Sequence, residues 1–226
     1  MAKKVSRKQL LKEPDQFLTF SGRMLEWAGQ RRKAILWTTA AFFGLVIAIS
    51  LFGFLSGRSE ARAFTLLDQA RRQYETVLSQ KGPQEALAAA TEDFQHILDD
   101  YAGRAGGRMA RVVFADICLS GGQADRAVTL YTQALDDYAG QPFYRTRIQA
   151  SLARALVEKE DYAAAVKWFE KIAENGGAMK DEALFMLGTL YAKLGEPAKS
   201  RDAFEKIAAE HGDSIYAELA REKARG

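Results

Sequence analysis

The residue types that could support catalysis or bind a metal are few in this sequence and widely spaced. The 226 residues include two histidines, His96 and His211, and one cysteine, Cys118. A metal site needs several such ligands close together, so this spacing gives no reason to expect one. Acidic pairs recur at 99–100 and 136–137, which favours the solvated end of a repeated helix over catalytic carboxylates. We therefore expect no enzyme, no cofactor and no metal.

One short motif is associated with nucleotide chemistry. Residues 119–123 read LSGGQ, the signature of ABC-transporter ATPases, in which a glycine-rich turn and the following helix contact the terminal phosphate. That chemistry also needs a G-x-x-x-x-G-K-[ST] loop, and the sequence contains no Gly-Lys followed by Ser or Thr. The five residues fall where a turn between helices is expected. We favour that structural interpretation, and a nucleotide-binding transport subunit is an alternative that only this motif supports.

A long apolar run predicts that the two ends of the chain lie in different compartments. Residues 34–57 are 24 consecutive uncharged residues. As a helix they would reach roughly 36 Å, against a hydrocarbon core of about 30 Å. A cleaved signal peptide has a shorter apolar core behind a short basic start, whereas 33 residues precede this run. We predict a single transmembrane helix over 34–57.

The charges flanking this helix predict its orientation. Residues 1–33 hold nine Lys and Arg against three acidic residues, although the net charge of the whole chain is only +3. The positive-inside rule then places residues 1–33 in the cytosol and 58–226 outside it. Arg58 and Arg62 weaken the contrast, so repeats that face the cytosol remain an alternative. The basic excess is confined to this short arm, which speaks against a nucleic-acid-binding surface.

The arm itself has an amphipathic pattern. Pro14 could open a helix in which Phe17, Phe20, Met24 and Trp27 recur every three or four residues. Such a helix would lie on the membrane surface or run straight into the spanning helix. Docking of a cytosolic partner on this segment is the alternative.

The remaining residues, 58–226, contain an internal repeat. A small residue precedes an aromatic one by four positions in four places, and the aromatic residues are spaced by 37, 38 and 35 positions. Residues four apart share a helix face, where the small side chain permits close approach and the aromatic fills the gap. The pattern therefore predicts about four stacked helical hairpins. The four pairs are Ala90 with Phe94, Ala127 with Tyr131, Ala165 with Phe169, and Ser200 with Phe204.

These residues resemble the tetratricopeptide repeat. The clearest copy, residues 181–211, has Leu187-Gly188, Tyr191, Gly195 and Phe204 at the family's positions. The resemblance implies an all-α fold, a right-handed solenoid of hairpins behind one transmembrane helix.

Other copies depart from the repeat pattern at single positions. In the third copy Glu160 replaces the turn glycine and Gln149 the first aromatic, and in the second copy Cys118 takes a tyrosine position. We expect Cys118 to be a small buried apolar residue. Residues 214–225 predict a helix that caps the last hairpin.

The overall layout is similar to ancillary Sec-translocon subunits and cell-division-coordinator-type repeat proteins. That resemblance implies a single-pass protein of the bacterial inner membrane, with its N-terminus cytoplasmic and its repeats in the periplasm. It also implies association with the translocon and its chaperones, without catalysis.

The first helices of stacked hairpins line a concave groove that suits a peptide or a partner's helix. We therefore expect protein or peptide partners, while the oligomeric state and the partner's identity stay open. Clamping of a chaperone's C-terminal carboxylate is not expected, because the Lys and Asn that it needs are missing at these positions. The predicted groove residues are Val112, Asp116, Leu119, Arg147, Arg154, Glu158, Phe185, Thr189 and Lys193.

Overall fold

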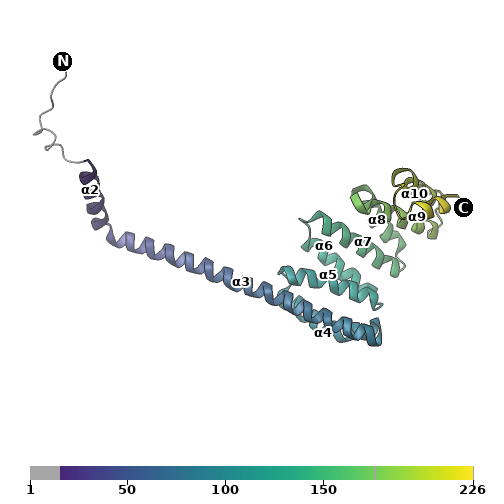
Figure 1. Ribbon diagram of the computed structural model, residues 1–226, viewed down its shortest axis with the longest axis horizontal. Helices are drawn as coiled ribbons and strands as arrows, with labels where there is room; N and C mark the ends of the chain where they lie inside the picture. Colours follow the sequence, from purple (N-terminus) through teal and green to yellow (C-terminus); the bar gives the residue numbers. More distant parts are fainter. Residues whose placement is uncertain (1–15, 176, 226) are drawn as a thin grey trace, which may run out of the picture. The chain divides into compact units, whose positions relative to one another are not determined.

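The computed structural model describes residues 16–175 and 177–225, and every long element among them is an α-helix (Figure 1). The all-α prediction is confirmed. Pro14, the expected start of the arm's helix, lies outside the described residues. The helices are α2 (Gln16–Gln30), α3 (Arg32–Lys81), α4 (Pro83–Tyr101), α5 (Ala105–Ser120), α6 (Ala124–Asp137), α7 (Pro142–Glu158), α8 (Tyr162–Asn175), α9 (Lys180–Lys193), α10 (Pro197–Glu210) and α11 (Ala217–Arg225), with a short 3-10 turn at Gly177–Met179 before α9.

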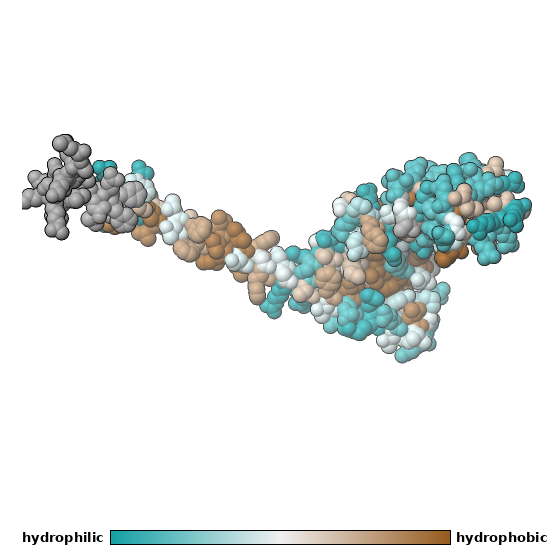
Figure 2. Space-filling view, turned by 45° about the horizontal axis from the view of Figure 1, so that its top comes forward, coloured by the Kyte–Doolittle hydropathy of each residue, from teal (hydrophilic) through white to brown (hydrophobic). Residues whose placement is uncertain are grey.

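The chain divides into two compact units, residues 1–57 and 58–226. The described part of the first unit consists of α2 and the first half of α3. Its apolar side chains are exposed along almost the whole run, as in Phe52 with 73% of its surface accessible (Figure 2). By length and composition, α3 is able to cross a membrane.

α3 differs from the expected helix in its length. A separate spanning helix was predicted over residues 34–57, but α3 continues without interruption to Lys81. The first strong helix breakers after the apolar run are Gly82, which adopts a φ of 89°, and Pro83. Residues 58–81 are therefore both the end of α3 and the opening helix of the first hairpin.

The second unit is a stack of helical hairpins. α5 pairs with α6, α7 with α8, and α9 with α10, and each hairpin also packs on the next one. The last part of α3 forms the first hairpin with α4, where the Gln73 side-chain amide donates a hydrogen bond to the Ala89 carbonyl at 3.1 Å. The same part of α3 also contacts α5, where the Gly106 N–H donates a hydrogen bond to Glu60 Oε1 at 3.0 Å.

The core is built from the repeated small and aromatic residues. All eight are buried, which confirms the repeat register. Phe94 stacks on Phe114 of the next hairpin, with ring centroids 5.0 Å apart. In the last hairpin a Cβ on Gly188 would lie 2.6 Å from the Phe204 ring, so glycine is needed there for this close packing. Cys118 is fully buried, as expected.

Three hairpins share one turn geometry. In each turn one backbone N–H donates a hydrogen bond to a carbonyl five residues earlier, in the last turn of the preceding helix. The pairs are Gln123 with Cys118, Asp161 with Leu156, and Glu196 with Tyr191, at 2.8, 2.9 and 2.8 Å. The preceding residue always has a positive φ, which is 80° at Gly122, 60° at Glu160 and 74° at Gly195. This is the Schellman pattern at a helix C-terminus.

The LSGGQ segment is one of these turns. Gly122 supplies the left-handed residue, and a Cβ on Gly121 would lie 2.5 Å from the Leu87 side chain of α4. Turn geometry and packing therefore account for both glycines without a nucleotide.

The C-terminal residues close the stack. Tyr216 stacks on Phe185 of α9 at 5.0 Å, and Ala217 and Ala220 of α11 are buried. α11 lies where the sequence predicts a capping helix, with its first turn three residues later than expected.

Candidate protein-binding groove

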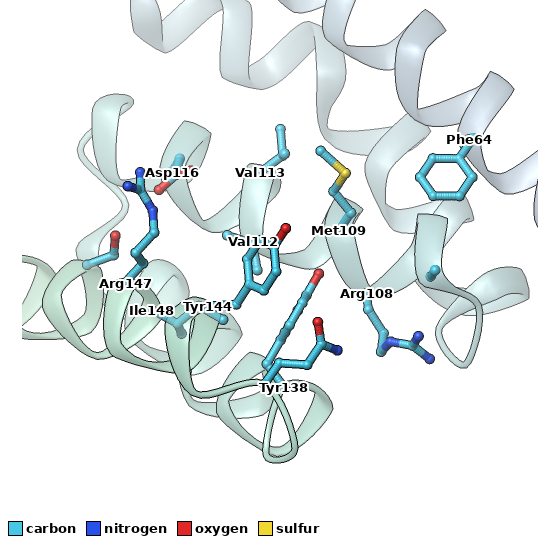
Figure 3. A pocket seen from close by; sticks show the side chains of 13 residues that line it. Phe64, Arg108, Met109, Val112, Val113, Asp116, Tyr138, Tyr144, Arg147 and Ile148 are labelled. Carbon is cyan, nitrogen blue, oxygen red and sulfur yellow. The ribbon is translucent and has the colours of Figure 1, made fainter. Parts of the chain in front are cut away.

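A cavity of about 370 Å³ opens between the first helices of the first three hairpins (Figure 3). Because these helices run side by side, their side chains converge on one hollow although they are far apart in the sequence. α3 contributes Phe64, α5 contributes most of one wall, and the start of α7 contributes the other. The lining residues used below are Phe64, Arg108, Met109, Val112, Val113, Asp116, Tyr138, Tyr144 and Arg147.

The floor of the cavity is apolar, yet several of its large side chains are exposed. Phe64, Met109 and Tyr144 keep 42%, 41% and 52% of their surface accessible. Val112 and Val113 lie between them and are half-buried. Figure 2 shows hydrophobic side chains gathered on this unit among a mostly polar surface. Clustered exposed apolar side chains in a hollow are typical of a binding surface.

A polar cluster borders one end of the cavity. The Tyr131 hydroxyl donates a hydrogen bond to the carboxylate of Asp116, and the Arg147 guanidinium points toward Asp116 (Figure 3). Surrounding protein desolvates the Asp116 carboxylate and raises its pKa, although Tyr131, Arg154 and Arg147 counteract the shift. Burial also raises the pKa of Tyr131 far above its ordinary value, and the bond to Asp116 adds to this rise. Tyr131 therefore stays a hydrogen-bond donor at every physiological pH.

Three of the predicted groove residues line this cavity. Val112 and Asp116 face it from α5, and Arg147 faces it from α7. Leu119, one turn beyond Asp116, is instead half-buried against the core. Arg154 reaches across to α9, where its guanidinium lies 3.5 Å from Glu182.

The other predicted residues lie outside the cavity. Glu158 is exposed as the last residue of α7. Thr189 donates a hydrogen bond to the Phe185 carbonyl at 3.0 Å, and the Lys193 ammonium lies over the Tyr162 ring, 4.8 Å from its centre.

Phe185 is placed differently from the expectation. Its ring packs between Tyr216 and Phe204, so the capping segment half-buries it. The repeat register located Phe185 on the correct helix, but it carried no information on what the C-terminal residues cover.

Four aromatic or sulfur-containing residues of the cavity were missed: Phe64, Met109, Tyr138 and Tyr144. Met109 and Tyr144 each lie three residues before a predicted groove position, so extending the register by one helical turn would have found them. Phe64 lies before the first small–aromatic pair, Ala90 with Phe94, in a stretch where the sequence shows no repeat register. Tyr138 follows the end of α6, outside the first helices that were considered.

The two histidines are separate from this cavity. His96 is exposed, with Nδ1 3.4 Å from Asp100 Oδ2. His211 caps the C-terminus of α10 and is half-buried, with its Nε2 shielded from solvent. In the part of the chain that the structure describes, no three His, Cys, Asp or Glu residues gather as metal ligands would.

Comparison with known proteins agrees with this architecture. A family model described as a tetratricopeptide repeat-like domain matches residues 26–223. Two crystal structures of the nearly identical TPR-like repeats of a Podosopora anserina putative kinesin light chain are similar to this chain, at 16% and 17% identity and TM-scores of 0.58 and 0.57. Each similarity covers 73% of this chain and 84% of the other. At this identity the likeness concerns the fold alone. No curated protein matches the sequence.

Proposed function

The chain belongs to the tetratricopeptide repeat-like family, and from this premise we propose that it is a membrane-anchored scaffold that binds partner proteins on the periplasmic side of a bacterial inner membrane. The repeat fold implies a scaffold for protein–protein interactions, and such folds are typically non-catalytic. Anchoring, side and partner class are the further steps of the proposal.

The exposed apolar cavity carries the binding part of the proposal. Phe64, Met109 and Tyr144 are large side chains that the fold leaves accessible although neighbouring core positions are fully buried. A partner that covers them would remove their apolar surface from contact with water, and this removal is the main favourable contribution to the free energy of protein association. Among the described residues, this concave hollow is the most apolar of the larger cavities.

The first half of α3 supports membrane anchoring. Its apolar run, residues 34–57, has the length of a bilayer's hydrocarbon core and leaves its side chains without protein partners in the described chain. A helix that is hydrophobic on all sides is otherwise found buried inside a large protein.

Charge asymmetry supports the orientation, and the layout supports the partner class. The basic arm, residues 1–33, favours a cytoplasmic N-terminus and therefore periplasmic repeats. The similarity in layout to ancillary Sec-translocon subunits suggests translocation or chaperone machinery as the partner. Confinement to the membrane raises the effective concentration of a weak binder near such machinery, so individual contacts need not be strong.

A reporter fusion tests the orientation. Alkaline phosphatase joined after Gly226 folds only outside the cytosol, and a fluorescent protein that folds only in the cytosol serves as its converse. We expect an active phosphatase and a dark fluorescent fusion. The opposite pair of results would show a cytosol-facing adaptor, and recovery of the whole chain in the soluble fraction would refute anchoring.

Site-specific photo-crosslinking tests the binding part. A photoreactive amino acid replaces Val113 in the full chain within intact membranes, and the same amino acid at Arg201, on the exposed side of α10, serves as the control. Discrete adducts at position 113 and not at 201 are expected. Equal adducts at both positions, or none, would contradict binding in the groove.

A further inference from the structure

A separate cavity of about 280 Å³ opens within the third hairpin, between α7, α8 and the turn that precedes α7. Its polar side chains are cationic or neutral, and no Asp or Glu of the described chain lines it. Glu174, which precedes Asn175 on α8, lines a different cavity, between α8 and α9. The polar lining residues that matter below are Arg145, Gln149, Lys171 and Asn175.

Two of these residues carry polar groups that lack a partner. Gln149 keeps only 6% of its surface accessible, yet its amide forms no hydrogen bond with a residue that the structure describes. The Nε–H of Arg145 is shielded from solvent and likewise has no acceptor there. Buried polar groups normally have a partner, because burial without one is unfavourable. Both residues line the same cavity, so one ligand with oxygen acceptors would serve both.

The neighbouring hairpins show which group is missing. Six residues beyond the repeat's aromatic residue, the second hairpin has Asp137 and the fourth has Glu210. Asp137 forms an ion pair with Arg111, from the first helix of its own hairpin. Glu210 likewise pairs with Lys180 of α9, at 2.7 Å. The third hairpin has Asn175 at this position, so an amide stands where both neighbours have a neutralising carboxylate.

The cations, in contrast, are present in the third hairpin. Arg145 of α7 precedes Lys180 by 35 residues, which is also the spacing of the aromatic residues of these two hairpins, so the two cations hold corresponding positions. Lys171 of α8 adds a second positive charge to the lining. Within the described ranges neither Arg145 nor Lys171 forms an ion pair. The cavity therefore has two uncompensated positive charges beside the unpartnered amide of Gln149.

From these observations we infer that the cavity binds a small dianion with oxygen acceptors, of the class of a short dicarboxylate or inorganic phosphate. Two negative charges match the two cations, and both carboxylates and phosphates accept charge-assisted hydrogen bonds from arginine and lysine. The anion substitutes for the carboxylate that the neighbouring hairpins supply from their own chain. This cavity shares no lining residue with the groove described above, so the inference is independent of the proposed function.

Isothermal titration calorimetry of the full chain in phosphatidylcholine nanodiscs tests the inference. The probes are disodium succinate and inorganic phosphate, in a buffer of low ionic strength without other polyvalent anions, because salt screens exposed charges. Sodium acetate, which carries a single charge, is the control ligand. We expect saturable binding of succinate, of phosphate or of both, at least about tenfold tighter than that of acetate. The preferred probe identifies the chemical group that the cavity takes.

One substitution restores the missing carboxylate. Asn175→Asp should place a carboxylate beside Arg145, as Glu210 lies beside Lys180, and should weaken binding of the preferred probe by about tenfold or more. Asn175→Ala is the matched control, because it removes the amide without adding a charge. Its effect on the affinity should be clearly smaller than that of Asn175→Asp.

Removal of the cations is a second test. Arg145→Gln should weaken binding by about tenfold or more, and Lys171→Gln by less, because Lys171 is the more exposed of the two. Arg201→Gln removes an exposed arginine that does not line the cavity and should leave the affinity unchanged. Circular dichroism confirms that each variant is folded.

Three results would overturn the inference. They are the absence of saturable binding of both dianions, an affinity for acetate equal to theirs, and undiminished binding by Asn175→Asp and Arg145→Gln. None of them bears on crosslinking at position 113, so the proposed function is tested separately.

Discussion

At the scale of single residues, Cys118 shows how the solenoid protects a reactive group. Its side chain is fully buried between hairpins at a position where the repeat usually has tyrosine. Burial raises the pKa of the Cys118 thiol to about 11, an effect that nearby Arg126 only partly counteracts. The thiolate, which is the nucleophile, is therefore scarce near neutral pH.

We predict that iodoacetamide modifies Cys118 very slowly in the folded chain at pH 8. The reagent cannot reach a fully buried sulfur unless the fold opens locally, and the raised pKa keeps the thiol protonated at this pH. The folded pKa lies above the unfolded one, so this thiol stabilises the fold below about pH 9, and the contribution is lost between about pH 9 and 11. Mass spectrometry of the labelled chain measures the rate, with the chain in urea as the accessible reference. Rapid labelling of the folded chain at pH 8 would contradict the burial.

Glu160 is a second residue to examine, because its backbone conformation lowers the stability of the fold. It has a φ of 60° in a turn where the equivalent residues are Gly122 and Gly195. A non-glycine residue in this left-handed conformation loses about 1–2 kcal/mol, part of which glycine gives back through the greater entropy of the unfolded chain.

Glu160→Gly should therefore increase the free energy of unfolding by about 0.5–1 kcal/mol. Urea unfolding followed by circular dichroism measures the change. The converse substitution, Gly195→Ala, is the control and should destabilise by a similar amount. A loss of stability in Glu160→Gly would mean that the Glu160 side chain makes a contact that outweighs the strain.

At the scale of elements, the start of α5 depends on two adjacent glycines. A Cβ on Gly106 would lie 2.8 Å from that of Ala63 in α3, and a Cβ on Gly107 would lie 1.8 Å from the Tyr101 carbonyl oxygen. The second of these neighbours is backbone and cannot rotate away. The junction between the first two hairpins therefore has no room for a side chain.

Gly107→Ala should destabilise the solenoid by about 3 kcal/mol or more, at the upper end of overpacking effects, because α5 must shift away from the end of α4. Thermal unfolding of the full chain tests this. Gly140→Ala is the matched control, since nothing lies within 4 Å of a Cβ there. Equal stability of the two variants would show that the junction is looser than described.

The helices could be predicted from the sequence more completely than the cavity could. The pairs such as Ala127 with Tyr131 could be predicted because burial of a small and an aromatic residue on one helix face is a local property. The predicted helix over 34–57 followed the apolar run alone and therefore missed the continuation to Lys81, although the first strong breakers, Gly82 and Pro83, indicate it. The cavity was only partly predictable: Arg147 follows from the register, whereas Phe64 joins the site through contacts between separate hairpins.

At the scale of the whole molecule, the stack depends on its closed C-terminal end. Tyr216 covers Phe185, and α11 buries Ala217 and Ala220 against the last hairpin. Terminal repeats need such covers, because an uncapped hairpin exposes the face that would contact a next repeat.

A chain that ends at Gly212 should consequently unfold at lower urea concentration and bind more of a dye that fluoresces on apolar surface. The milder variant Tyr216→Ala should show a smaller decrease in the urea concentration of unfolding and a smaller increase in dye binding. A chain that ends at Ala224 retains the covering residues and serves as the control. Unchanged dye binding in the Gly212 truncation would show that α11 does not protect the end of the stack.

The common hydrogen-bond pattern of the three turns has an evolutionary consequence. Since one backbone geometry accepts Gly-Gly, Lys-Glu and Leu-Gly, a gene segment that runs from one such turn to the next, about 35 to 38 residues long, can be duplicated or excised while the turns at its two ends keep their form. Descendants of this architecture are free to vary in reach by whole modules, and natural selection can then adjust the lining of each added module separately.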